Sequence, residues 1–119
     1  MAGIYEMAKE LGGALARTEE YQALKRASDA AEEERELVEL RNRITAIEAE
    51  LEASLRAGKE PADELKERYA AAANELQALP AFQRVVAAQA NFEKVMYRVN
   101  ETVAKGIEEG ASSRIIISS

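Results

Sequence analysis

The side chains of this sequence that could take part in chemistry are carboxylates and hydroxyls. The chain has 22 Asp and Glu residues but no histidine and no cysteine. Carboxylates in a helical bundle hold a di-iron centre together with Glu-x-x-His pairs, which a chain without histidine cannot supply. The same two absences remove the commonest general base and metal ligand, thiolate sites and disulfides. We therefore predict no metal site and no cofactor.

The remaining candidates for catalysis are too isolated to act. Ser112, Ser113, Ser118 and Ser119 cluster near the C-terminus without a recognisable base. Gly12-Gly13 is an isolated pair, and neither GxGxxG nor GxxxxGK[ST] occurs, so no phosphate-binding loop is expected. These observations predict that the protein is not an enzyme and has no catalytic residues.

Charge and hydropathy limit the kinds of partner. Lys and Arg number 16 against 22 acids, which gives a formal net charge of −6 that repels phosphate backbones. The basic residues are spread among carboxylates, so we predict no direct nucleic-acid binding. The segment from Met1 to Leu15 contains acids and no long apolar run, which predicts neither a signal peptide nor a membrane span. We expect a cytoplasmic protein.

The elements that must position these side chains are helices. Ala, Glu, Leu, Arg and Lys are abundant, aromatic residues reach only 5%, and apolar residues recur at helical spacing, which predicts an all-α fold. A first short helix has its apolar face at Ile4, Met7, Ala8, Leu11, Ala14 and Leu15. Gly12 and Gly13 weaken this helix unless another backbone packs closely there. Thr18 is the expected N-cap of a second helix.

The middle of the chain predicts a long antiparallel helical hairpin. One arm carries a near-heptad stripe of Leu37, Leu40, Ile44, Ile47, Leu51 and Leu55, and the other carries Leu65, Tyr69, Ala72, Leu76 and Leu79. Between them lies the turn RAGKEP, where Gly58 suits a left-handed conformation and Pro61 suits a helix start. Four acid–base pairs spaced i,i+4 are expected to stabilise individual helices: Glu39–Arg43, Glu52–Arg56, Glu64–Arg68 and Glu101–Lys105.

A last long helix is predicted from about Ala81 to Glu108, ending at Gly110. Its expected inner side is Phe82, Val85, Val86, Phe92, Met96, Val99, Val103 and Ile107. The three β-branched residues Ile115 to Ile117 favour an extended tail. The chain thus divides into one helical domain, residues 1–110, and a C-terminal tail, residues 111–119.

The apolar stripes predict association with a second chain. Val38, Ala71, Ala73 and Val95 widen the stripes beyond what one antiparallel neighbour covers, which indicates an elongated helical-bundle homo-oligomer, most simply a dimer. The competing interpretation is that the first helix folds back over the second stripe. Gln89 either fixes register between chains as a buried amide or lies at the edge of the face in water. The candidate core and oligomer-interface residues are Leu37, Leu40, Ile44, Ile47, Leu51, Leu55, Tyr69, Leu76, Phe82, Gln89, Phe92, Met96 and Val99.

Several segments together resemble a known family. They are Ile4-Tyr5 with Ala8 and Leu11, Glu19-Glu20-Tyr21 with Leu24-Lys25, the turn RAGKEP, Leu79-Pro80-Ala81-Phe82-Gln83, Asn91-Phe92 and Asn100. Over Ile4 to Ile107 the chain resembles the YlbF, YmcA and YheA family of small bacterial helical regulatory proteins. This resemblance implies a helical, oligomeric regulatory or adaptor protein whose partners are other family members or an RNA-processing nuclease complex. YlbF and YmcA join YaaT in such a complex, which acts with the endoribonuclease RNase Y.

The sequence departs from the family pattern in two places. Cysteines that hold an iron–sulfur cluster in some members are absent, so that activity is not carried over. Many members have Asp-Pro where this chain has Glu34-Arg35, which leaves open whether the second and third helices are continuous. Two functions remain: a non-enzymatic regulatory adaptor acting through helix-mediated protein contacts, and a self-associating structural protein.

Overall fold

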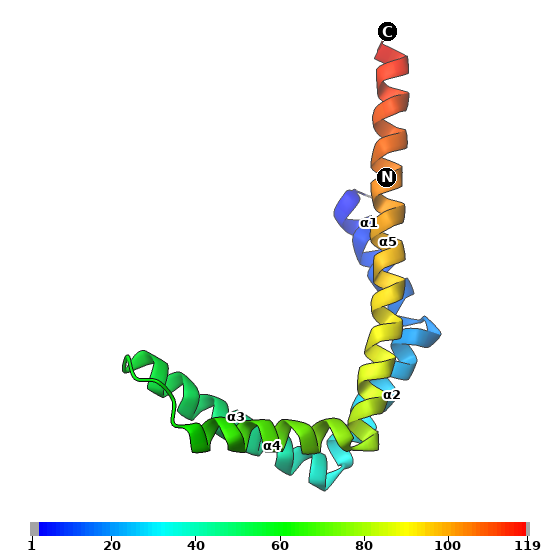
Figure 1. Cartoon of the computed structure of the whole chain (residues 1–119). Coiled ribbons are helices and arrows are strands. Elements are labelled where there is room, and N and C mark those ends of the chain that lie inside the picture. The colour runs from blue at the N-terminus through cyan, green and yellow to red at the C-terminus, as the bar shows by residue number, and fades with distance from the viewer. Residues whose placement is uncertain (1–2, 119) are drawn as a thin grey trace.

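The chain folds into two helical arms that meet at an elbow (Figure 1). The computed structural model describes residues 3–118, and the side chains of residues 3–112. Over these residues there are five α-helices and no strand, which confirms the all-α prediction. They are α1 (Ile4–Ala16), α2 (Glu19–Glu33), α3 (Arg35–Arg56), α4 (Asp63–Ala78) and α5 (Pro80–Ser118). The molecule is elongated, with extents of 68 × 37 × 22 Å.

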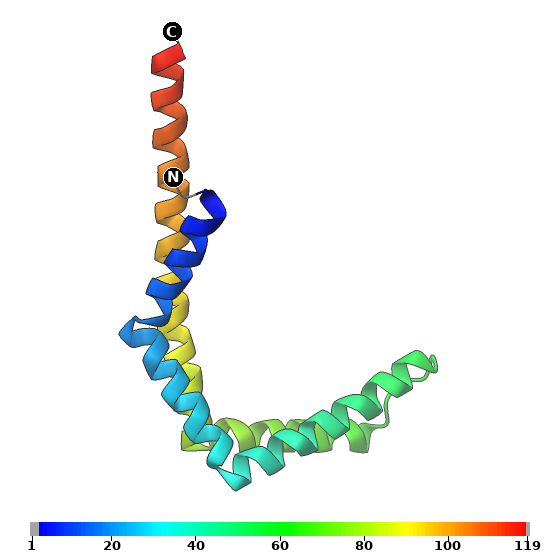
Figure 2. The ribbon, with the colours of Figure 1, turned by 180° about the vertical axis from the view of Figure 1, so that it is seen from behind.

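The first arm consists of α1 and α2 lying along α5 (Figure 2). Thr18 separates α1 from α2 as predicted: its Oγ1 accepts a hydrogen bond from the Tyr21 amide at 3.1 Å and caps α2. Helices α2 and α5 pack together, and the Tyr21 and Phe92 rings meet edge to face with 5.4 Å between their centroids. Aromatic pairs favour this geometry, because the positive edge of one ring meets the negative face of the other. Ala88 of α5 is buried on the same arm.

The second arm is the predicted antiparallel hairpin of α3 and α4. The turn follows Arg56, and Gly58 has a φ of 72°. Glycine adopts this conformation without a Cβ clash. Three apolar residues of α3 and the small Ala72 of α4 are buried. The buried residues of α3 are Leu37, Leu40 and Ile47.

The elbow forms where the chain passes between the two arms, at Glu34 between α2 and α3 and at Leu79 between α4 and α5 (Figure 1). Leu79 is extended (φ −73°, ψ 128°), because the following Pro80 disfavours a helical conformation in the residue before it. Pro80 then begins α5, where its missing amide proton costs nothing. Glu34 is also extended (φ −81°, ψ 107°), so α2 and α3 are separate helices although no proline marks the break.

The end of α5 differs from the prediction. The helix passes through Gly110 to Ser118, so the predicted end at Gly110 and the extended tail over Ile115 to Ile117 are both wrong. Each residue added to an existing helix gains a hydrogen bond without a new nucleus, and this outweighs the weak helix preference of glycine and of β-branched residues. The side chains of these isoleucines lie outside the described ones. The division between residues 1–110 and 111–119 stays a prediction.

The surface ion pairs also differ in part from the prediction. Glu52 and Arg56 pair at 2.7 Å within α3 as expected. Arg43 instead pairs with Glu75 at 3.8 Å, across the hairpin. Arg68 likewise reaches Glu50 of α3, at 3.9 Å, so the expected pairs Glu39–Arg43 and Glu64–Arg68 are wrong. The expected pair Glu101–Lys105 is also not formed among the described residues. All these partners are solvent-exposed, where an ion pair contributes about 0.2–1 kcal/mol.

Candidate interaction surface

The carboxylates of the described residues do not gather into a reactive site. No group of three or more among them could hold a metal ion, and no polar or charged side chain of this part of the chain is buried. Their charges therefore remain in solvent.

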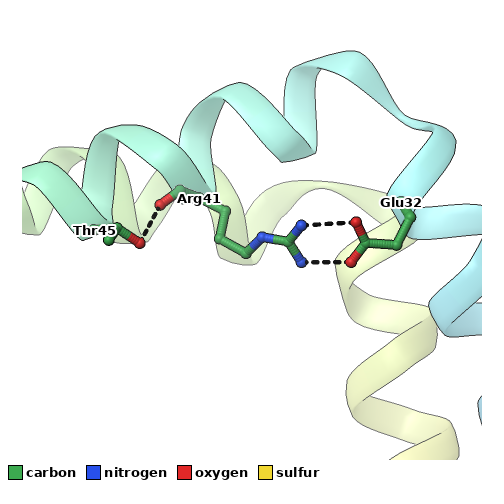
Figure 3. Close-up of polar contacts among 3 residues, drawn as sticks. All are labelled: Glu32, Arg41 and Thr45. Atoms are coloured by element: carbon green, nitrogen blue, oxygen red, sulfur yellow. Dashed lines mark hydrogen bonds and ion pairs between the residues drawn. The ribbon is translucent and has the colours of Figure 1, made fainter.

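A bidentate polar contact lies at the elbow. Glu32 at the end of α2 accepts two hydrogen bonds from Arg41 of α3, Nη1 to Oε1 at 2.8 Å and Nη2 to Oε2 at 2.9 Å (Figure 3). These hydrogen bonds, together with the positive charge of Arg41, lower the pKa of the Glu32 carboxyl. Both side chains are about half exposed, at 47% for Arg41 and 59% for Glu32. The pair joins the two helices that Glu34 separates, so it is structural.

The predicted core and interface residues of the hairpin differ in how far they are buried. Leu37, Leu40 and Ile47 are buried, whereas Leu55 at the tip of the hairpin is 67% exposed. The remaining predicted residues of this arm are half-buried: Ile44, Leu51, Tyr69 and Leu76. Two packed helices cover each other from one side only, which leaves the edges of each stripe open. The hairpin stripe is therefore core near the elbow and surface at the tip.

The predicted candidates on α5 lie in the other arm. Phe82, Phe92, Met96 and Val99 are half-buried. Gln89 is exposed. Within a single chain it therefore lies in water at the edge of the apolar face, which is the second of its two interpretations. Val86, predicted on the inner side, is 48% exposed and is not part of the covered face.

An apolar wedge opens between α1 and the distal half of α5. We define this wedge as Ile4, Met7 and Leu11 of α1 with Val103 and Ile107 of α5. Exposure rises toward the open end along both helices, from 40% at Leu11 to 58% at Met7 and 72% at Ile4, and from 50% at Val103 to 69% at Ile107. A groove of about 460 Å³ marks the closed end, where Leu11 and Val103 both line the open space.

In the wedge, α1 leaves Val103 and Ile107 of α5 exposed. Helix α1 has no buried residue, although it lies beside α5. The sequence indicated the apolar face of α1 and placed Val103 and Ile107 on an inner side, but none of these residues was among the candidate interface residues. Periodicity identifies an apolar face without telling which neighbour covers it, and only the relative placement of the helices showed these faces to be open.

This fold and surface define a class of protein: an elongated all-α chain whose distinctive surface is an uncovered apolar helix face. Over the described residues, no helix is long and apolar enough to cross a membrane. The chain belongs to the family described as control of competence regulator ComK, YlbF/YmcA, whose family model matches residues 4–108. The match confirms the YlbF/YmcA resemblance, and with it a regulatory family role. A comparison with individual curated proteins finds no match.

Proposed function

We propose that the protein is a non-enzymatic regulatory adaptor that binds other protein chains through exposed apolar helix surfaces. The observation that carries this proposal is the wedge between α1 and α5, whose five large apolar side chains are each at least 40% exposed. Contiguous apolar surface of this kind on a soluble domain is typical of protein–protein contact sites. The regulatory description of the family agrees with a function exerted on other proteins.

The extent of the surface supports the same proposal. The chain has a mass of 13.1 kDa and exposes 9499 Å². A compact monomer of this mass exposes about 6400 Å². The excess arises because two thin arms each leave one side of their helices uncovered. The family resemblance suggests other family members or an RNA-processing nuclease complex as the partners.

Affinity capture from native cells tests the adaptor function. The tagged full-length chain is compared with Leu55→Asp at the hairpin tip and with Ile107→Asp in the wedge. The control, Ala49→Asp, adds the same charge at an exposed position of α3 that lies outside both apolar sites. We expect the unchanged chain and the control to recover a second protein, and at least one of the two apolar variants to lose it. Recovery of the chain alone by the unchanged protein would contradict the adaptor function.

The second candidate function is a self-associating structural protein. The distal half of α5 favours it, because one face of this helix is uncharged from Val95 to Ile107. In the same capture experiment, this candidate predicts that only copies of the chain are recovered. The two functions therefore differ in the identity of the recovered protein.

A further inference from the structure

Distal α5 has a broad face free of charge, which is half-buried at Val95, Met96 and Val99 and exposed at Val103 and Ile107. At 3.6 residues per turn, the positions around Val103 span about 200° of the helix circumference without an ionisable side chain. They are Val95, Met96, Val99, Asn100, Thr102, Val103, Ala104, Gly106 and Ile107. The charged residues of this segment, Arg98, Glu101, Lys105 and Glu108, lie on the opposite side of the helix. A chain with a net charge of −6 thus keeps one helix face on which a second copy meets no charged side chain.

This face is uncharged in both directions from Val103. Four positions away on either side lie Val99 and Ile107, and seven positions away lie Met96 and Gly110. An antiparallel second copy centred on Val103 therefore places Val99 against Ile107 and the long Met96 against the space left by Gly110. In a two-fold interface each of these contacts occurs twice, because each residue i meets residue j and each j meets i.

Two glycines support a close neighbour at the same place. Gly106 and Gly110 lie inside α5, four residues apart, where glycine weakens a helix relative to alanine. A Cβ added at either position would meet nothing within 4 Å in the single chain, so no contact within the described part of the chain requires them. Small residues at this spacing allow a second helix to approach closely.

The chain as a whole exposes more surface than a compact molecule, and such a contact would use part of it. A stable protein–protein interface buries about 800 Å² on each partner. The chain exposes 9499 Å², which exceeds the compact value by about 3000 Å².

We propose that the wedge and distal α5 bind a second copy of this chain, with the two α5 helices antiparallel and the two-fold axis passing Val103. The Val99–Ile107 segment of each copy then lies along α1 of the other, covering Met7 and Ile4. The two hairpin arms project from this central four-helix body. This inference rests on the proposed function only in treating the wedge as a protein-contact surface.

Molar mass in solution is the first test. Size-exclusion chromatography with light scattering on the full chain at tens of micromolar should give twice 13.1 kDa. Val103→Lys places two like charges at the two-fold axis and should halve the mass. Val86→Lys is the matched control, since Val86 is on the same helix and is 48% exposed against 50% for Val103, and it should remain a dimer. Circular dichroism checks that both variants keep their helices. An unchanged chain with the mass of one copy overturns the proposal.

Cysteine cross-linking tests the register, and the chain has no native cysteine to interfere. Val103→Cys should cross-link to itself with a short bismaleimide. Val99→Cys should not, because its two copies are offset by about 12 Å along the helices. A mixture of Val99→Cys and Ile107→Cys should cross-link. Self-linking of Val99→Cys as efficient as that of Val103→Cys would indicate parallel helices and overturn the antiparallel register.

The two proposals fail in different ways. A monomeric chain that captures another protein from native cells overturns the dimer and supports the adaptor. A cross-linked antiparallel dimer that captures no other protein supports the interface and contradicts the adaptor.

Discussion

Arg41 of α3 binds Glu32 of α2 through two parallel hydrogen bonds of 2.8 and 2.9 Å, and so bridges the break at Glu34. The planar guanidinium matches both carboxylate oxygens, which makes the contact directional as well as charged. It therefore favours one angle between the helices that meet at the elbow (Figure 3).

Replacing Arg41 with Ala should return the pKa of Glu32 toward its ordinary value, because the lowering comes from the hydrogen bonds and charge of Arg41. In the unchanged protein the pKa of Glu32 is lower in the folded than in the unfolded state. Its contribution to stability is therefore fully present above the unfolded pKa and is lost as pH falls through the lower folded pKa. Carboxyl NMR titration measures the pKa, and urea unfolding across the acidic range measures the stability. Arg35→Ala, which removes an exposed charge from the same helix, should leave the pKa of Glu32 unchanged.

Replacing Ile47 with Ala should lower the free energy of unfolding by about 2–5 kcal/mol, because loss of a buried side chain leaves a cavity. The Ile47 side chain is 1% exposed, whereas Leu55 is 67% exposed. The same truncation at Leu55 should therefore cost no more than about 0.5 kcal/mol in a single chain. Ile44, from the same stripe, is half-buried and should fall between them. Chemical denaturation measures the free energy of unfolding of the three variants. An equal decrease for the Ile47 and Leu55 variants would contradict the burial described for the hairpin.

Replacing Thr18 with Ala should cost about 1 kcal/mol, because the helix loses the hydroxyl that caps its first turn. This hydroxyl accepts the hydrogen bond from the Tyr21 amide. Thr45 provides the control, because its hydroxyl bonds the Arg41 carbonyl within α3, where the helix needs no cap. Thr45→Ala should change stability by less than about 0.5 kcal/mol. Thermal unfolding followed by circular dichroism compares the two variants, and a neutral Thr18→Ala would mean that the cap does not contribute.

Two glycine substitutions should act in opposite directions. Gly58 has a φ of 72°. Gly58→Ala should destabilise the hairpin by about 1–2 kcal/mol, because a Cβ in this left-handed conformation comes too close to the following carbonyl oxygen. A Cβ at Gly12 meets nothing within 4 Å in the described part of the chain. Gly12→Ala should therefore stabilise α1 by about 0.5–1 kcal/mol, because alanine is the better helix former.

Unfolding free energies measured side by side test both glycine substitutions. Destabilisation by Gly12→Ala would reveal a close neighbour of α1 from another chain. A neutral Gly58→Ala would contradict the left-handed turn.

The sequence by itself determined the features that depend on neighbouring residues. Thr18 caps a helix and Gly58 turns the hairpin, because backbone preferences act over a few positions. Helical periodicity likewise predicted the all-α class and which residues share a face. The family resemblance followed from these local signals.

Only the tertiary structure decided which faces are covered. Ile47 and Leu55 belong to one stripe, yet one is buried and the other exposed, because burial depends on where the partner helix and the elbow lie. Arg43 pairs with Glu75 across the hairpin rather than with Glu39 one turn away in its own helix. The break at Glu34 is likewise not predicted by a proline. Such outcomes depend on segments distant in sequence, whose relative placement no local preference encodes.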